Sequence, residues 1–226
     1  MKINPFNLKK SELQQYMTGY CKHRAPYQQH PNCFKNEILN ENKCLRIGIL
    51  DIESFGMNSL KANTGIMLTY FIKVYHKNKF YSGKIKQKDL RSNNLDKNLI
   101  KQLIKDITKF DKIITYYGSR FDIPYIRTKA VKYNFKFPLY KYILHKDVYY
   151  TIKHRFSFAR NSLKSACSYF GIKGKTNVNY NHWIKAVTGN QKSLNYVYMH
   201  NKPDVVILEK LYDKVNGFEY NSKRSI

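Results

Sequence analysis

Residues 45–53 read Leu-Arg-Ile-Gly-Ile-Leu-Asp-Ile-Glu, and this stretch determines how the rest of the chain is interpreted. Its apolar, β-branched part, which ends at Asp51, is typical of a short buried strand. Asp51 and Glu53 stand two residues apart, so in extended backbone both side chains point to the same face. The stretch therefore predicts a buried strand that ends in a pair of carboxylates.

The segments on either side of this strand predict an α/β domain. Further strands are predicted where β-branched and aromatic residues gather, at 66–76, 79–85 and 112–116. Apolar residues at helical spacing predict a helix at 95–110, and further helices are predicted at 124–133, 146–154, 161–170 and 202–215. This order predicts a mixed sheet with helices packed on it. Residues 1–44 are polar and carry Cys and His. We therefore expect a small N-terminal extension over 1–44 and one domain over 45–226.

The composition favours a nucleic-acid partner. The 226 residues include 41 Lys and Arg against 15 Asp and Glu, a formal net charge of +26, together with 20 Tyr and 13 Phe. Lys and Arg neutralise phosphates, and aromatic rings offer stacking surfaces to unpaired bases. An AT-rich genome, bacterial or viral, also enriches Lys, Asn and Ile through codon bias, but it does not explain the scarcity of acids. We expect contact with single-stranded DNA or RNA.

The same composition excludes several protein classes. The hydrophobic fraction of 42% is enough for one core, which excludes long disordered chains. No apolar run approaches the ~18 residues that span a bilayer, and the N-terminus lacks the apolar region of a signal peptide. Four irregularly spaced cysteines indicate a reducing compartment. We therefore expect a cytoplasmic protein without a membrane partner.

Four acids occupy positions that indicate metal chemistry. Besides Asp51 and Glu53, Asp122 follows the fourth predicted strand, and Asp204 opens the last predicted helix after Pro203. Each alone has an ordinary explanation, such as a surface pair or an acid at a helix N-terminus. As an ordered set they favour phosphodiester hydrolysis with two divalent metal ions, because hard cations take oxygen ligands and two of them clamp the attacking and leaving oxygens.

These motifs resemble those of a known family. Asp51-Ile52-Glu53, Tyr-Gly-x-x-Phe-Asp ending at Asp122 and His-x-x-x-Asp ending at Asp204 are similar to the three exonuclease motifs of the DEDD (DnaQ-like) 3′–5′ exonucleases. The resemblance covers about residues 45–216 and is closest to the branch of predicted ribonuclease-H-like nucleases carried by bacteria and phages. It implies a ribonuclease-H-like sheet flanked by helices, in a bacterial or phage-infected cell. It also implies that the four acids hold two Mg²⁺ or Mn²⁺ ions.

The chain departs from the family pattern at two positions. Family members usually have Asn, which braces the site, where this chain has Tyr117. One branch places a Tyr four residues before the last Asp, and the other places a His five before it. Here His200 stands four residues before Asp204, which on a helix is the same face. We predict that His200 is the general base, with Tyr196 and Tyr198 as alternatives.

Basic residues follow in the second half of the chain. We expect them to contact phosphates without reading sequence. They are Lys153, Arg155, Arg160, Lys164 and Lys175. Asp147 resembles an additional acid near the site of relatives, or simply begins a helix.

The N-terminal extension carries two closely spaced ligand pairs, Cys21-x-His23 and His30-x-x-Cys33. Such pairs suit a structural zinc ion, and Cys44 can replace one ligand. The alternative is that they are ordinary loop residues. Cys167, on an apolar helix face, is expected in the core.

The functional prediction is a two-metal-ion-dependent 3′–5′ exonuclease that acts on single-stranded ends. Two alternatives remain: a nucleic-acid-binding protein on the same fold with weak or no catalysis, and a structure-specific endonuclease. The fold does not dictate exonuclease or endonuclease action.

Overall fold

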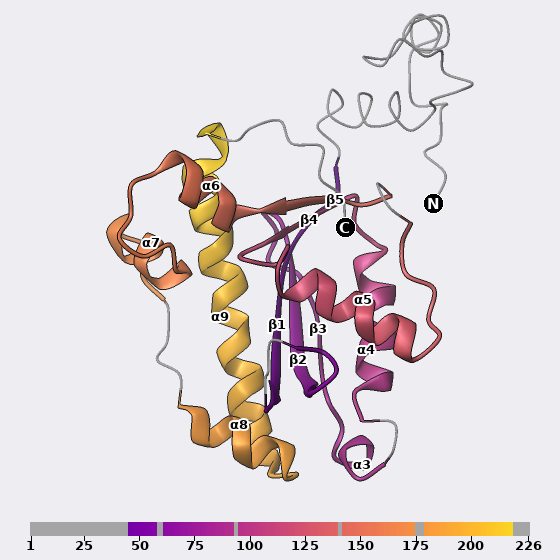
Figure 1. The fold of residues 1–226 in the computed structure, drawn as a ribbon. Helices are drawn as coiled ribbons and strands as arrows, with labels where there is room; N and C mark the ends of the chain where they lie inside the picture. The colour runs from indigo at the N-terminus through magenta and orange to yellow at the C-terminus, as the bar shows by residue number, and fades with distance from the viewer. Residues whose placement is uncertain (1–44, 58–60, 93–94, 140–141, 175–178, 219–226) are drawn as a thin grey trace, which may run out of the picture. The chain divides into compact units, whose positions relative to one another are not determined.

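A five-stranded sheet with the order β3-β2-β1-β4-β5 forms the centre of the fold (Figure 1). The computed structural model describes residues 45–57, 61–92, 95–139, 142–174 and 179–218. β2 (Gly65–Val74) pairs antiparallel with β1 (Ile47–Gly56) and with β3 (Phe80–Lys84). β4 (Lys112–Thr115) pairs parallel with β1, and β5 (Leu144–Asp147) pairs parallel with β4. The sheet is therefore mixed.

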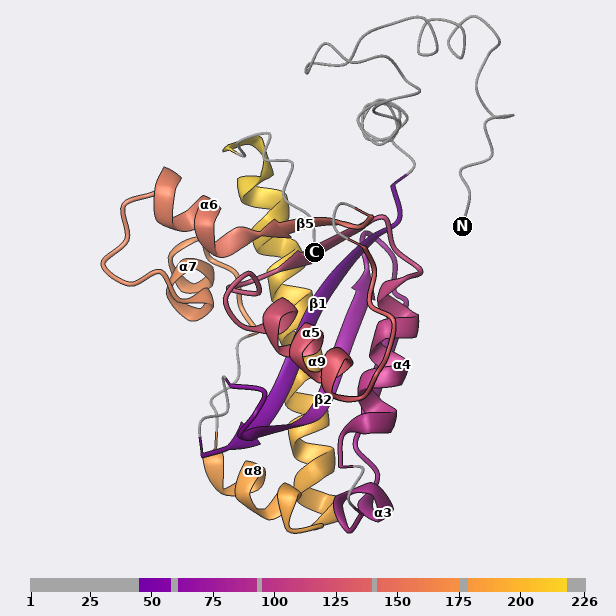
Figure 2. The ribbon, with the colours of Figure 1, turned by 45° about the vertical axis from the view of Figure 1, so that its right-hand side comes forward.

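Helices cover both faces of this sheet. α4 and α5 pack on one face, and α9 with α6 and α7 covers the other (Figures 1 and 2). Their bounds are α3 Gln87–Leu90, α4 Lys97–Ile107, α5 Asp122–Lys132, α6 Val148–Arg155, α7 Leu163–Tyr169, α8 Tyr180–Val187, α9 Gln191–Val215 and the 3₁₀ turn η2 Asn216–Phe218. None of the helices in the described ranges has the length and apolar character needed to cross a membrane.

The alternation of side chains along β1 separates two cores. Leu50 and Ile52 belong to the cluster that contains α4, α5 and the start of α9, whereas Ile49 belongs to the cluster formed by α6, α7 and the second half of α9. Asp51 and Glu53 have the same parity as Ile49, so their side chains point to the α9 face. The prediction of an α/β fold with a mixed sheet and flanking helices is confirmed.

The first strand is longer than the sequence predicts. β1 runs through Asp51 and Glu53 to Gly56, because its pairing with β2 continues as far as Gly56↔Gly65. A bulge between Glu53 and Ser54 shifts the register there. The two acids therefore lie inside the strand, not at its end.

The predicted helix at 146–154 was wrong at its start. Residues 144–147 form β5, and α6 begins only at Val148. The sequence Leu-His-Lys-Asp gives no apolar alternation, so the strand depends on pairing with β4 and not on local pattern.

The last helix also begins earlier than predicted. α9 starts at Gln191, and Asn190 caps it because its side chain accepts a hydrogen bond from the Ser193 N–H. Pro203 and Asp204 lie in its interior and do not open it. A proline costs a helix one hydrogen bond, but buried residues on both sides of Pro203 hold the two halves against the sheet. α3 and α8 were not predicted.

Candidate active site

Glu53 on β1 meets His200 and Asp204 on α9. In the described part of the chain these three form one group whose ligand atoms all lie within 4.8 Å of one another. His200 and Asp204 are one helical turn apart, and each is only 5% exposed. The group therefore combines two carboxylates and an imidazole in a largely dry setting.

Polar and aromatic contacts fix α9 over the sheet at this point. The fully buried Asn201 donates from Nδ2 to Oγ1 of Thr69 on β2 at 3.1 Å and to the Asp51 carbonyl at 3.5 Å. Three residues earlier, the Tyr198 ring packs on Phe71 with ring centroids 4.6 Å apart. These contacts set the rotation of α9 that turns His200 and Asp204 toward β1.

Asp122 joins the site from the N-terminus of α5. β4 pairs with β1 only from Ile47 to Ile49, so the pairing of these two strands ends before Ile52. The Ile52 N–H donates instead to Asp122 Oδ1 at 3.2 Å. Because Ile52 lies between Asp51 and Glu53, this hydrogen bond places the third acid against the first two.

The Asp122 carboxyl is 2% exposed and lies among like charges. Burial, together with the negative charges of Asp147 and Glu53, raises its pKa to about 8, against the opposing effect of backbone hydrogen bonds such as that from Ile52. Buried carboxylates gathered in this way are stabilised by a cation.

Asp147, the last residue of β5, braces the loop that leads to Asp122. Its Oδ1 accepts from the N–H groups of Tyr117 at 2.7 Å and Tyr149 at 3.1 Å, and its Oδ2 accepts from the Ser119 N–H at 2.9 Å. Asp147 thus caps α6, as expected of a residue that begins a helix, and it also holds the loop that leads to Asp122. Burial raises the pKa of this carboxyl, while the backbone donors lower it.

The loop itself has a demanding backbone. Tyr117 adopts a left-handed φ of 67°, where Asn is tolerated better than Tyr. At Gly118 a Cβ atom would overlap the Thr115 side chain, so only glycine fits. Asp147 holds this loop through the N–H groups of Tyr117 and Ser119.

Sequence reasoning missed Trp183 on α8. Its Nε1–H donates to Glu53 Oε2 at 3.2 Å, and its ring edge meets the His200 ring with centroids 5.3 Å apart and planes at 82°. Trp183 is 4% exposed and is the single Trp of the chain. Only that uniqueness distinguished it, since no spacing links α8 to β1.

The two tyrosines proposed as alternative bases have different surroundings. The Tyr198 hydroxyl bonds to Ser82 Oγ of β3 at 2.8 Å. The Tyr196 ring stacks on His182 at 3.9 Å and lies parallel to the His200 ring at 6.3 Å. His200 is the candidate base that shares the ligand group with Glu53 and Asp204.

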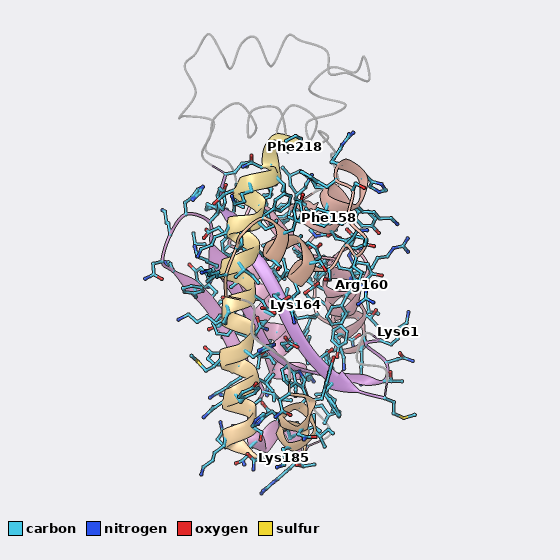
Figure 3. The ribbon with its side chains drawn as sticks, turned by 90° about the vertical axis from the view of Figure 1, so that its left-hand side faces the viewer. Lys61, Phe158, Arg160, Lys164, Lys185 and Phe218 are labelled. Atoms are coloured by element: carbon cyan, nitrogen blue, oxygen red, sulfur yellow. The ribbon has the colours of Figure 1, made fainter. Side chains whose placement is uncertain are left out.

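The remaining predicted residues are placed as follows. Lys153 and Arg155 are exposed in α6, Arg160 and Lys164 are exposed at α7, and Cys167 is buried as expected (Figure 3 labels Arg160 and Lys164). Asp51 shares the β1 face of Glu53 but is not a member of the three-residue group, and neither is Asp122. The predicted phosphate contact Lys175, the predicted zinc ligands Cys21, His23, His30 and Cys33, and Cys44 lie outside the described residues.

The donor set fits a divalent metal ion. The Glu53 and Asp204 carboxylates lie close enough to contact one cation together, and the His200 imidazole lies within 4.8 Å of both. Asp122, held beside Glu53 through Ile52, adds carboxylate oxygens of the kind that Mg²⁺ and Mn²⁺ prefer.

Comparisons with known proteins place this arrangement in a family. A solved structure of the family B DNA polymerase from the hyperthermophilic archaeon Pyrobaculum calidifontis is similar in fold, with a TM-score of 0.61 and 16% identity. The match covers 76% of this chain but 24% of the polymerase chain, and a search of the curated proteins found no match. A family model described as RNase_H superfamily matches residues 49–216, more than half of the chain. The chain therefore belongs to the ribonuclease H superfamily.

Proposed function

We propose that this protein is a metal-dependent 3′–5′ exonuclease of the DEDD type that hydrolyses phosphodiester bonds at single-stranded nucleic-acid ends. The observation that carries the proposal is the convergence of Glu53, His200 and Asp204 within 4.8 Å. Membership of the ribonuclease H superfamily supports a nuclease-type activity and a nucleic-acid substrate.

The carboxylates supply the metal-binding role. Asp51, Glu53, Asp122 and Asp204 would hold two Mg²⁺ or Mn²⁺ ions, with Trp183 fixing one oxygen of Glu53. When bound, such ions supply positive charge that stabilises the phosphoryl oxygens of the reacting phosphodiester. The burial of Asp122 and Asp204 excludes much of the water that would screen this charge.

His200 supplies the proton transfer. As the water oxygen bonds to phosphorus, an imidazole nitrogen of His200 takes the proton that the water loses. The bond between phosphorus and the 3′ oxygen breaks, and that oxygen takes up a proton from solvent. The products are a nucleoside 5′-monophosphate and a strand shortened by one nucleotide.

The test is incubation of the protein with 5′-labelled single-stranded DNA and RNA, with Mn²⁺ or with EDTA. Asp204→Asn keeps the shape of a site residue but removes its charge. Asp213→Asn, on the same helix, is the matched control, since Asn can still accept the hydrogen bond that Asp213 receives from the Tyr75 hydroxyl.

We expect a metal-dependent ladder of shortened strands from wild type and Asp213→Asn, and none from Asp204→Asn. Discrete internal fragments would indicate an endonuclease instead. An intact but retarded oligonucleotide would indicate a binding protein, and either result would refute the exonuclease.

A further inference from the structure

The segment between the site acids Asp147 and Asp204 contains no Asp or Glu. Residues 148–203 carry nine Lys and Arg, although the chain has 15 acids elsewhere. Those that the structure describes are all exposed. The segment forms α6, α7, α8 and the first half of α9, which is the side of the domain that Figure 3 faces. A positive surface of this kind attracts a polyanion.

Aromatic rings gather on the same side, at the end of α9. Phe156 contacts Phe170 at 5.5 Å and Phe218 at 5.1 Å, and Phe158 contacts Tyr169 at 5.3 Å. Phe156, Phe158 and Phe170 pack against the core cluster under α9. Tyr169 and Phe218, by contrast, are 79% and 56% exposed. Two exposed rings thus rest on a rigid support, which we name the aromatic platform.

Two cations lie close to this platform in the sequence, since Arg160 is two residues from Phe158 and Lys164 is on α7 together with Tyr169. Arg160 and Lys164 are exposed beside α7, and Figure 3 shows them on the same side of the molecule as Phe158 and Phe218. Exposed rings bordered by cations match the chemistry of a single strand, whose phosphates meet the cations and whose unpaired bases stack on the rings. A duplex keeps its bases stacked on one another and gains only the phosphate contacts.

Two helices run from the candidate active site to the platform, and their lengths give the approximate distance between the two. α6 begins after Asp147 and ends at Arg155, eight residues or about 12 Å of helix. α9 runs eleven residues from Asp204 to Val215, about 16 Å. At about 3.4 Å for each stacked nucleotide, these lengths correspond to about four or five nucleotides.

We propose that the aromatic platform, with Arg160 and Lys164 at its border, binds a single-stranded nucleic acid through bases about four or five nucleotides from the 3′ end. The assignment of that end to the active site rests on the proposed function. The stacking itself does not, because it needs only the exposed rings and the cations.

The first experiment measures binding in EDTA, so that its outcome is independent of hydrolysis. The probe is a fluorescent single strand of about 12 nucleotides, a length within the range of known single-strand sites, and the readout is anisotropy. Tyr169→Ala removes the most exposed ring, Tyr169→Phe keeps it, and Tyr142→Ala removes an exposed tyrosine outside the platform. Thermal melting checks that each variant is folded.

We expect Tyr169→Ala to raise the Kd about tenfold for the single strand and to leave the Kd for a duplex of the same sequence unchanged. Tyr169→Phe and Tyr142→Ala should bind as wild type does. A Tyr169→Ala protein that binds the single strand like wild type, or one that loses single-strand and duplex binding equally, would overturn the stacking role.

The second experiment tests the position of the platform on the strand. Substrates carry abasic nucleotides at about the fourth and fifth positions from the 3′ end, or near the 5′ end as the control. For wild type we expect the abasic nucleotides at the fourth and fifth positions to raise the KM of the first cleavage about tenfold with little change in kcat. For Tyr169→Ala we expect the same KM with and without these abasic nucleotides. An equal KM for all substrates would refute the position, and a lack of cleavage would refute the proposed function while leaving the binding result intact.

Discussion

Replacing Trp183 by Phe tests whether the hydrogen bond from Trp183 to Glu53 holds this metal-binding carboxylate in place. Phe keeps an aromatic ring in the core cluster to which Trp183 belongs, but it removes the Nε1–H that donates to Glu53 Oε2. Glu53 then loses a neutral donor that fixes one of its two oxygens. We expect the ion-binding geometry to loosen while the fold is kept.

The magnitude follows from the contact. A hydrogen bond to a charged group contributes about 1.5–3 kcal/mol, and loss of a partner behind a metal ligand typically weakens metal binding by about 10–100-fold. The N···O distance of 3.2 Å is at the long end for such a bond. We therefore expect the lower end of the range, a Kd for Mn²⁺ about tenfold higher, which corresponds to about 1.4 kcal/mol.

The assay is a titration of Mn²⁺ followed by the electron paramagnetic resonance of the free ion. Tyr198→Phe is the matched control, because it removes one hydroxyl hydrogen bond from α9, to Ser82, away from Glu53. Its Kd should equal that of wild type. If Trp183→Phe is folded and binds Mn²⁺ as tightly as Tyr198→Phe does, Trp183 does not position Glu53 and the reasoning is wrong.

Three further predictions concern the frame of the site. Gly118→Ala should lower the free energy of unfolding by about 1–3 kcal/mol, since its Cβ overlaps Thr115, whereas Gly217→Ala, in open space, should not; urea denaturation compares them. Lys129→Met should cost about 3–5 kcal/mol in the same measurement, because Lys129 is 1% exposed and its Nζ lies 2.9 Å from the buried Asp96, whose charge would lose its partner; equal stability would contradict this. The raised pKa of about 8 keeps Asp122 protonated at lower pH, whereas a cation needs the ionised carboxylate, so the affinity for Mn²⁺ should rise from pH 6 to 8 and binding should release protons. Calorimetry in buffers of different ionisation enthalpy detects this release, and a pH-independent affinity would contradict the prediction.

Local pattern was enough for the elements whose burial is regular. α4 has its apolar residues at helical spacing, with Leu99, Ile100, Leu103 and Ile107 buried, and it lies within the predicted helix at 95–110. β2 and β4 are rich in β-branched residues and were also predicted. α4 buries one face, so its helical period is visible in the sequence, whereas β2 and β4 are buried on both faces and are identified by their residue types.

Elements defined by their neighbours were missed. β5 reads Leu-His-Lys-Asp and is a strand because β4 pairs with it. The first half of α9 has no strong apolar period of its own and is ordered by its Asn190 cap and by burial of Leu194 and Val197. Pro203 suggested a helix start because a proline removes one helical hydrogen bond. The tertiary packing that outweighs this loss in α9 cannot be recognised from the local sequence.

The sequence by itself determined the order of the main strands and helices, the excess of positive charge and the identity of the acids that stand out. Only the tertiary structure brought Glu53 within 4.8 Å of His200 and Asp204, and only it placed Trp183 behind Glu53. Glu53 on β1 lies more than a hundred positions from the residues that α8 and α9 contribute. Periodicity reports the face that a segment buries, whereas such contacts depend on the strand order and on the rotation of α9, which Asn201 and Tyr198 fix through β1 and β2.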